Sequence, residues 1–169
     1  MPTTTQVAGW PVVVEPGLPS AAHDALLARL GRIFALIESA LPGHLAGIRP
    51  HVSTLQVIRF PCRGAFVQPE RALIVERTFL ADPARHDAEI AATILHEGEH
   101  ARLRGLGEAE TMTLADEERS CRRVEIAFGQ LVEGGEVVVA RATEALLLAD
   151  QDVAPDVDWQ VAWERTDGG

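Results

Sequence analysis

The sequence predicts an α+β fold that is mainly helical, with a small antiparallel sheet or β-ribbon packed on a central helix. Hydrophobic residues make up 47% of the 169 residues, but only 5% are aromatic and Tyr is absent, so a core of mostly aliphatic side chains is expected. Apolar residues recur at helical spacing in four segments, about 21–40, 91–104, 113–131 and 137–149. Two further segments have the β-branched content and length of strands, 52–60 and 71–79.

The length predicts a single domain over residues 1–169, with less regular ends. Residues 1–19 are rich in Pro and Gly and predict an irregular arm with a short strand at 12–14. Ser20 is a suitable N-cap for the first helix, which Pro42 and Gly43 are expected to end.

The two predicted strands are expected to pair with each other and to lead into the central helix. Strand-breaking residues at 61–64 separate the two strands. After the second strand, Asp82 is the expected N-cap of the central helix, and Pro83 is expected in its first turn.

The chain after the central helix is expected to hold two more helices and a tail. Gly105 and Gly107 predict a break. Thr113 with Asp116 resembles a capping box and begins the next helix. The tail 151–169 is acidic and contains Pro, and Trp159 and Trp163 are expected to pin it to the body.

The net charge of the chain and its first residues indicate which partners and which cellular location to expect. The formal net charge of −10 disfavours binding to nucleic acid and to anionic membrane surfaces. The first residues lack the features of a signal peptide and no apolar run reaches membrane-spanning length, so a cytoplasmic protein is expected. Cys62 and Cys121 are far apart in sequence, which favours two reduced core residues.

The central helix carries an H-E-x-x-H motif. His96 and His100 are four residues apart, so both imidazoles can face one ion from the same side of a helix. Glu97 is next to His96 and is the expected general base for a water molecule on that ion. The motif predicts Zn²⁺ as cofactor and a hydrolytic reaction.

A catalytic zinc needs a third protein ligand, and no His follows His100 in the chain. The next helix offers three carboxylates, Glu117, Glu118 and Glu125. Helical periodicity alone does not choose among them, and each could instead pair with neighbouring arginines on the surface.

The motifs of both helices resemble those of small bacterial gluzincin-type zinc metallopeptidases, in which a Glu ligand begins the helix after the H-E-x-x-H helix. They are more similar still to a group of uncharacterised bacterial proteins with H-E-x-x-H-A-R and E-R-x-C-x-x-x-E-x-A-F. The resemblance implies a zincin-like domain that binds zinc. It places Glu118 at the ligand position and Glu125 at a second fixed carboxylate, which we expect to hold a ligating His or to serve as an alternative ligand.

The expected function is a zinc metallopeptidase that hydrolyses a peptide or protein substrate, with Glu97 taking the proton of the attacking water. The oxyanion-stabilising residue is left open among His44, His51, His86 and an Arg such as Arg122. In peptidases of this kind an edge strand binds the substrate backbone, and 72–79 is the expected strand. The alternatives are a non-catalytic zinc-binding protein or interaction module on the same fold, and a metal-free helical adaptor.

Overall fold

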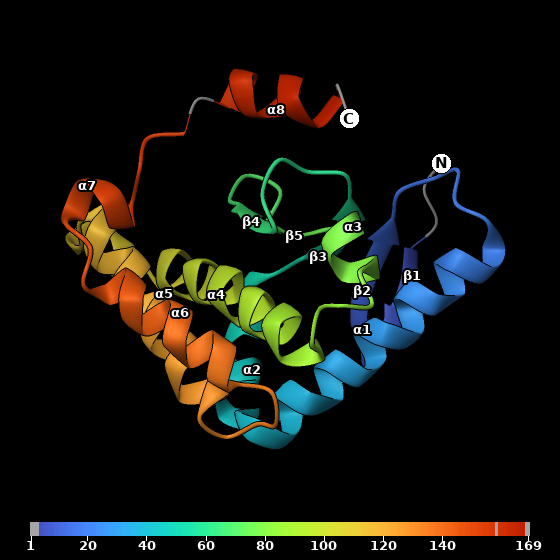
Figure 1. The fold of residues 1–169 in the computed structure, drawn as a ribbon, viewed down its shortest axis with the longest axis horizontal. Coiled ribbons are helices and arrows are strands. Elements are labelled where there is room, and N and C mark those ends of the chain that lie inside the picture. The colour runs from blue at the N-terminus through green and yellow to red at the C-terminus, as the bar shows by residue number, and fades with distance from the viewer. Residues whose placement is uncertain (1–3, 158, 168–169) are drawn as a thin grey trace.

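The computed structural model describes residues 4–157 and 159–167. The described part is mostly helical with one five-stranded sheet (Figure 1). The strands are β1 (Thr4–Val7), β2 (Trp10–Val14), β3 (Thr54–Ile58), β4 (Gly64–Val67) and β5 (Ala72–Glu76). The helices of the N-terminal half are α1 (Ser20–Ala40), α2 (Pro42–Ile48), the 3₁₀ turn η1 (Arg49–His51) and α3 (Arg77–Ala81). Those that follow are α4 (Asp87–Gly105), the 3₁₀ turn η2 (Glu108–Thr111), α5 (Leu114–Gly129), α6 (Glu136–Leu146), α7 (Asp150–Val153) and α8 (Trp159–Asp167).

The sheet has the order β1-β2-β3-β5-β4 and is mixed rather than antiparallel. β3 and β5 run parallel, which corrects the predicted antiparallel pairing of these two segments. The reason is the short strand β4, which was not predicted: only its first residue, Gly64, belongs to the expected breaking segment 61–64. It pairs antiparallel with β5 and reverses the chain, so β5 returns in the direction of β3.

The N-terminal residues form part of the sheet, so the predicted irregular arm was wrong for residues 4–11, whereas the short strand predicted at 12–14 is confirmed as part of β2. β1 and β2 form a hairpin, and β2 pairs in parallel with β3. Trp10 is buried and its ring stacks on that of Phe34 of α1, with the centroids 5.2 Å apart. Burial of a large aromatic ring fixes the hairpin to the core despite its proline content.

Two element boundaries differ from the prediction because side chains cap helices at other places. Glu76 ends β5 and caps α3, where its carboxylate accepts a hydrogen bond from the Phe79 amide at 2.6 Å. The N-cap of α4 is His86 rather than Asp82. Its Nδ1 accepts from the Ala88 amide, and Glu89 closes the capping box.

Helix α4 is buried on nearly every side and crosses the middle of the molecule (Figure 1). It packs on β4 and β5, on α1 and α2, and on α5. Gly98 lies where α2 crosses α4, and a Cβ atom there would come within 2.7 Å of Ile48 Cδ1. Gly98 is therefore explained by close approach of another segment rather than by tolerated drift, the two explanations that the sequence left open.

The C-terminal helices complete the structure. α5 and α6 pack on each other, and α6 also contacts α4. Helix α8 lies beyond the loops around β4 (Figure 1), where Trp163 meets Phe60 edge to face at a centroid distance of 5.4 Å. The expected contact of the Trp159 side chain lies outside the described residues. None of the helices in the described part of the chain is long and apolar enough to cross a membrane.

Candidate metal centre

The two histidines of the motif point one nitrogen each at the same carboxylate. His96 and His100 are buried on α4, and their ring centroids are 5.1 Å apart. Nε2 of His96 lies 3.2 Å from one oxygen of Glu118, and Nε2 of His100 lies 3.1 Å from the other. Three of the predicted ligand residues therefore meet at one point between α4 and α5.

The other nitrogen of each imidazole is held by a different carboxylate. Nδ1 of His96 lies 2.6 Å from Glu125, and Nδ1 of His100 lies 2.6 Å from Glu117. Because an ionised carboxylate can only accept, both Nδ1 atoms donate, so Nε2 is the nitrogen of each ring that could coordinate a metal ion. The structure thus places Glu117, left open as a ligand by the sequence, behind His100, and Glu125 behind His96, where the sequence reasoning expected a supporting carboxylate.

Arginines surround these supporting carboxylates. Arg104 Nε donates to Glu117 at 2.7 Å. Arg122 donates to one oxygen of Glu125 at 2.7 Å, and Arg141 of α6 donates to the other at 3.2 Å. Glu125 is only 1% exposed, so these hydrogen bonds compensate the cost of burying its charge.

The electrostatics of the site require positive charge between the carboxylates. Burial alone would lower the pKa of His96, but hydrogen bonds to Glu118 and Glu125 and the nearby Glu97 raise it to about 10. The pKa of His100 is raised to about 9 in the same way, by Glu117 and Glu118. For Glu118, burial would raise the pKa, but His100 and His96 hold it well below its usual range.

The donor set fits a divalent cation. A tetrahedral zinc ion with bonds of about 2.0–2.1 Å spaces its ligand atoms by about 3.3 Å. The two contacts between Nε2 atoms and Glu118, at 3.1 and 3.2 Å, are close to that spacing. Imidazole and carboxylate are ligands that zinc accepts.

A buried cysteine is a further possible ligand. His96, His100 and Cys121 form a buried group whose ligand atoms lie within 4.8 Å of one another, and this group could hold a metal ion. Burial raises the pKa of the Cys121 thiol well above its usual value, which disfavours the thiolate. We favour Glu118 over Cys121 as the third ligand because the Glu118 oxygens already contact both Nε2 atoms. The sequence reasoning treated Cys121 only as a core residue.

The remaining motif residue, Glu97, faces a cleft of about 350 Å³ next to His96. Nine residues line the cleft: Cys62, Arg63, Gly64, Thr93, His96, Glu97, Arg122, Glu125 and Arg141. β4 comes very near α4 here, since a Cβ atom on Gly64 would lie 3.1 Å from Glu97 Cγ. Cys62 is half-buried at the cleft, so its prediction as a core residue was wrong.

The four candidates for stabilising an oxyanion separate in the structure. Arg122 lines the cleft, whereas the three histidines do not. His44 lies 3.2 Å from Glu99, His51 lies against Gly105, and His86 caps α4. Sequence reasoning missed Arg63 and Arg141, because they reach the cleft from a loop and from α6, which tertiary packing alone brings there.

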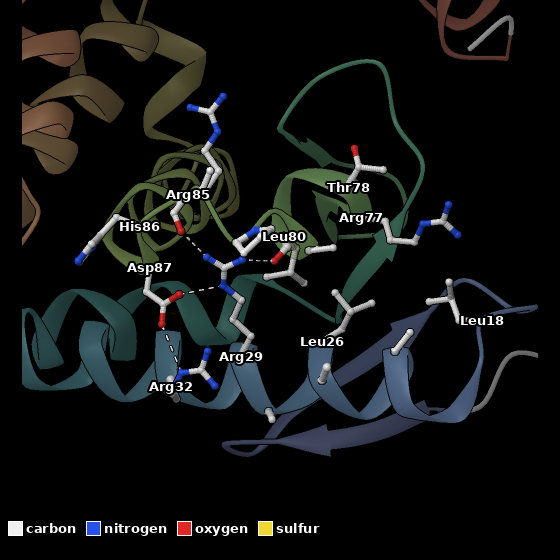
Figure 2. Close-up of a pocket in the computed structure, with 16 residues that line it drawn as sticks. Leu18, Leu26, Arg29, Arg32, Arg77, Thr78, Leu80, Arg85, His86 and Asp87 are labelled. Atoms are coloured by element: carbon white, nitrogen blue, oxygen red, sulfur yellow. Dashed lines mark hydrogen bonds and ion pairs between the residues drawn. The ribbon is translucent and has the colours of Figure 1, made fainter.

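A larger cavity of about 1010 Å³ lies elsewhere, between α1, α3 and the start of α4 (Figure 2). Of the predicted site residues, only His86 lines it, and its Nδ1 already accepts a hydrogen bond as the N-cap of α4. The guanidinium of Arg29 is used internally: it pairs with Asp87 at 2.8 Å and donates to the carbonyl oxygens of Leu80 and Asp82. Arg29 therefore has a structural role at the larger cavity, because its guanidinium is occupied by hydrogen bonds within the protein.

Comparison of the chain with protein-family models, with curated proteins and with solved structures finds no match.

Proposed function

We propose that the protein is a zinc-dependent metallopeptidase with a zincin-like arrangement of its motif helix and sheet, as the resemblance of its motifs implies. The observation that carries the proposal is the convergence of His96 Nε2, His100 Nε2 and the Glu118 carboxylate, with Glu97 facing the adjoining cleft. Two imidazoles and one carboxylate with an accessible base beside them form the minimal set for metal-assisted hydrolysis.

The side chains divide the work as follows. His96, His100 and Glu118 would hold the zinc, and Glu125 and Glu117 orient the imidazoles through Nδ1. The zinc, when bound, polarises the substrate carbonyl and lowers the pKa of a water molecule to about 7. Glu97 takes the proton of the attacking water and transfers it to the leaving amine. Arg122, at the cleft wall, is placed to stabilise negative charge on the carbonyl oxygen.

The sheet edge that can bind a substrate backbone is β4 and not the expected segment 72–79. β5 lies between β3 and β4 and is buried along its whole length. β4 is the last strand of the sheet on this side, and Gly64 at its start lies against Glu97. A peptide added to β4 would therefore pass directly over the cleft.

The test is a Glu97→Gln variant compared with the wild type, both loaded with zinc. Zinc content should stay at one ion per chain, while hydrolysis of a peptide library should fall by about 10²–10⁴-fold, the usual contribution of a general base. Glu110→Gln, at an exposed position of η2, is the matched control and should retain full activity. An equally active Glu97→Gln protein would contradict the proposed reaction.

The second candidate is a non-catalytic zinc protein, and the observation that favours it is Cys121. If Cys121 joined His96, His100 and Glu118, four protein ligands would close the coordination sphere, as in structural zinc sites. A Cys121→Ser variant separates the two candidates. Loss of zinc from this variant, with no peptide hydrolysis by the wild type, would favour the structural site.

A further inference from the structure

The cleft beside the metal centre carries an unusual concentration of positive charge for so acidic a chain. Only 15 residues of the chain are Lys or Arg, against 25 Asp and Glu. Three of the arginines nevertheless line one cleft of about 350 Å³, and they come from different elements: Arg63 from the loop before β4, Arg122 from α5 and Arg141 from α6. They outnumber the two cleft carboxylates, Glu97 and Glu125.

Glu125 pairs with only part of the positive charge of these arginines. Arg122 and Arg141 each give it one hydrogen bond, but the Nε atoms of both arginines are buried without a partner in the described part of the chain. Unused buried donors are costly unless a ligand or water pairs with them.

Arg63 has no carboxylate partner among the described residues. Its guanidinium lies over the ring of Phe79, whose centroid is 5.0 Å from the guanidinium carbon. Burial, followed by repulsion from Arg141 and Arg85, lowers the pKa of Arg63 in spite of Glu89 and Glu125. Like charges that are packed this closely repel one another, and an anionic ligand bound between them would reduce that repulsion.

We propose that Arg63, with Arg141, binds a carboxylate of the peptide substrate next to the scissile bond. This inference rests on the proposed function, because it assigns the substrate class of that same cleft. A carboxylate suits planar guanidinium donors, which can bind both of its oxygens. The volume is near the lower limit of ligand pockets, about 300–1,000 Å³, and fits a chain end better than a long segment. The carboxylate comes either from the substrate C-terminus or from an Asp or Glu side chain.

The experiment measures binding to the zinc-loaded Glu97→Gln protein, so that it does not depend on turnover. Three N-acetylated alanine peptides serve as probes in calorimetry or NMR titration: one with a free C-terminal carboxylate, the same peptide as an amide, and an amide that ends in Asp. We expect the free acid to bind at least about tenfold more tightly than the plain amide. Comparable binding of the Asp amide would identify a side chain as a sufficient source of the carboxylate.

Variants in the same background locate the site. Arg63→Gln should reduce the preference for the acid to less than about threefold, and Arg63→Lys should restore part of it, because charge is kept while the planar donor pair is lost. The matched control is Arg85→Gln, which removes a neighbouring charge that pairs with Asp82 and Glu89 outside the cleft. It should keep the full preference.

Equal binding of all three probes, no measurable binding of any probe, or a preference for the carboxylate-bearing peptides that survives in an Arg63→Gln/Arg141→Gln double variant would overturn the carboxylate site. These outcomes are distinct from failure of the proposed hydrolysis. A wild-type protein that cleaves the acid, the amide and the Asp amide equally would retain the peptidase and refute the carboxylate site. A protein that cleaves no peptide but binds the acid selectively would retain the carboxylate site and refute the peptidase.

Discussion

Glu118 holds a position that the other carboxylates of α5 do not share, because its two oxygens reach the Nε2 atoms of both histidines. We therefore predict that Glu118→Gln lowers zinc affinity by more than about 100-fold, beyond the 10–100-fold typical of supporting residues. Competition with a chromophoric chelator measures the affinity. Cys121→Ala is the paired variant and should change it by less than about threefold. If Cys121→Ala instead lowered zinc affinity strongly and Glu118→Gln changed it little, Cys121 would be the third ligand.

The carboxylates behind the imidazoles should act through the histidines. Glu125→Gln and Glu117→Gln should each weaken zinc binding by about 10–100-fold, since an amide fixes the tautomer of its histidine less well. The effect should be larger for Glu125, because its loss also leaves Arg122 and Arg141 without their counter-charge. The same chelator titration measures the zinc affinity of each variant, and circular dichroism confirms that the variants are folded. Unchanged affinity in both variants would exclude an orienting role.

Some residues of the site could be predicted from the sequence and others could not. His96, Glu97 and His100 are close in the chain, so a short motif on a helix is enough to find them. Glu118 and Glu125 required the spacing of a second motif. Periodicity puts Glu117 closest to the apolar stripe and Glu118 with Glu125 at its border, and it does not choose a ligand among them. Arg63 and Arg141 lie far from the motif in sequence, and only the packing of α6 and of the loop before β4 places them at the cleft.

At the scale of elements, the crossing of α2 and α4 depends on Gly98. Ala has the higher helix propensity by about 1 kcal/mol, but a Cβ atom here would meet Ile48 at 2.7–2.9 Å. Overpacking of this kind costs about 1–3 kcal/mol, so Gly98→Ala should destabilise the protein in urea denaturation.

Gly31 is the matched control, since a Cβ atom there would meet only Val7, at 3.9 Å. Gly31→Ala should therefore stabilise the protein by up to about 1 kcal/mol. If Gly98→Ala were stabilising to the same degree, close packing of α2 would not be the reason for the glycine.

The long helices and the strands β2, β3 and β5 were predictable from the sequence, whereas other short elements were not. α1, α4, α5 and α6 have apolar faces that repeat over several turns, and the structure confirms helices in all four places. β1, β4, α2 and α3 are four to seven residues long, too short for a period to show. Their existence depends on partners, such as the pairing of β4 with β5 or the Glu76 cap on α3, which no local pattern contains.

The N-terminal hairpin illustrates the point and is testable. Trp10 is 2% exposed between β2 and α1, so Trp10→Ala should cost about 3–5 kcal/mol of the free energy of unfolding. Trp163→Ala is the control, because that side chain is 38% exposed on α8 and should cost about 1 kcal/mol or less. Equal losses in thermal or urea denaturation would mean that the hairpin does not belong to the core.

At the scale of the whole molecule, the proposed site joins elements that otherwise meet through few charged contacts. α4 supplies both histidines and the base, α5 supplies three carboxylates, and α6 and the loop before β4 supply arginines. The chain as a whole is acidic, yet the cleft has more guanidinium groups than carboxylates. Such a contrast would repel polyanions from the molecule at long range while still admitting a single carboxylate at short range, where direct hydrogen bonds outweigh the screened field.

Because the ligands come from two core helices, metal binding should be coupled to global stability. A ligand at 100 times its dissociation constant stabilises the folded state by about 2.7 kcal/mol. For a chain of this size each kcal/mol moves Tm by about 2–4 °C, so zinc should raise Tm by about 5–10 °C over the EDTA-treated protein. Calorimetry on matched samples measures the shift. In Glu118→Gln the shift should be much smaller, since the two imidazoles alone bind weakly. An identical Tm with zinc and with EDTA in the wild type would show that the helices do not share a metal ion. The buried carboxylates would then be neutralised by protonated histidines together with Arg104, Arg122 and Arg141.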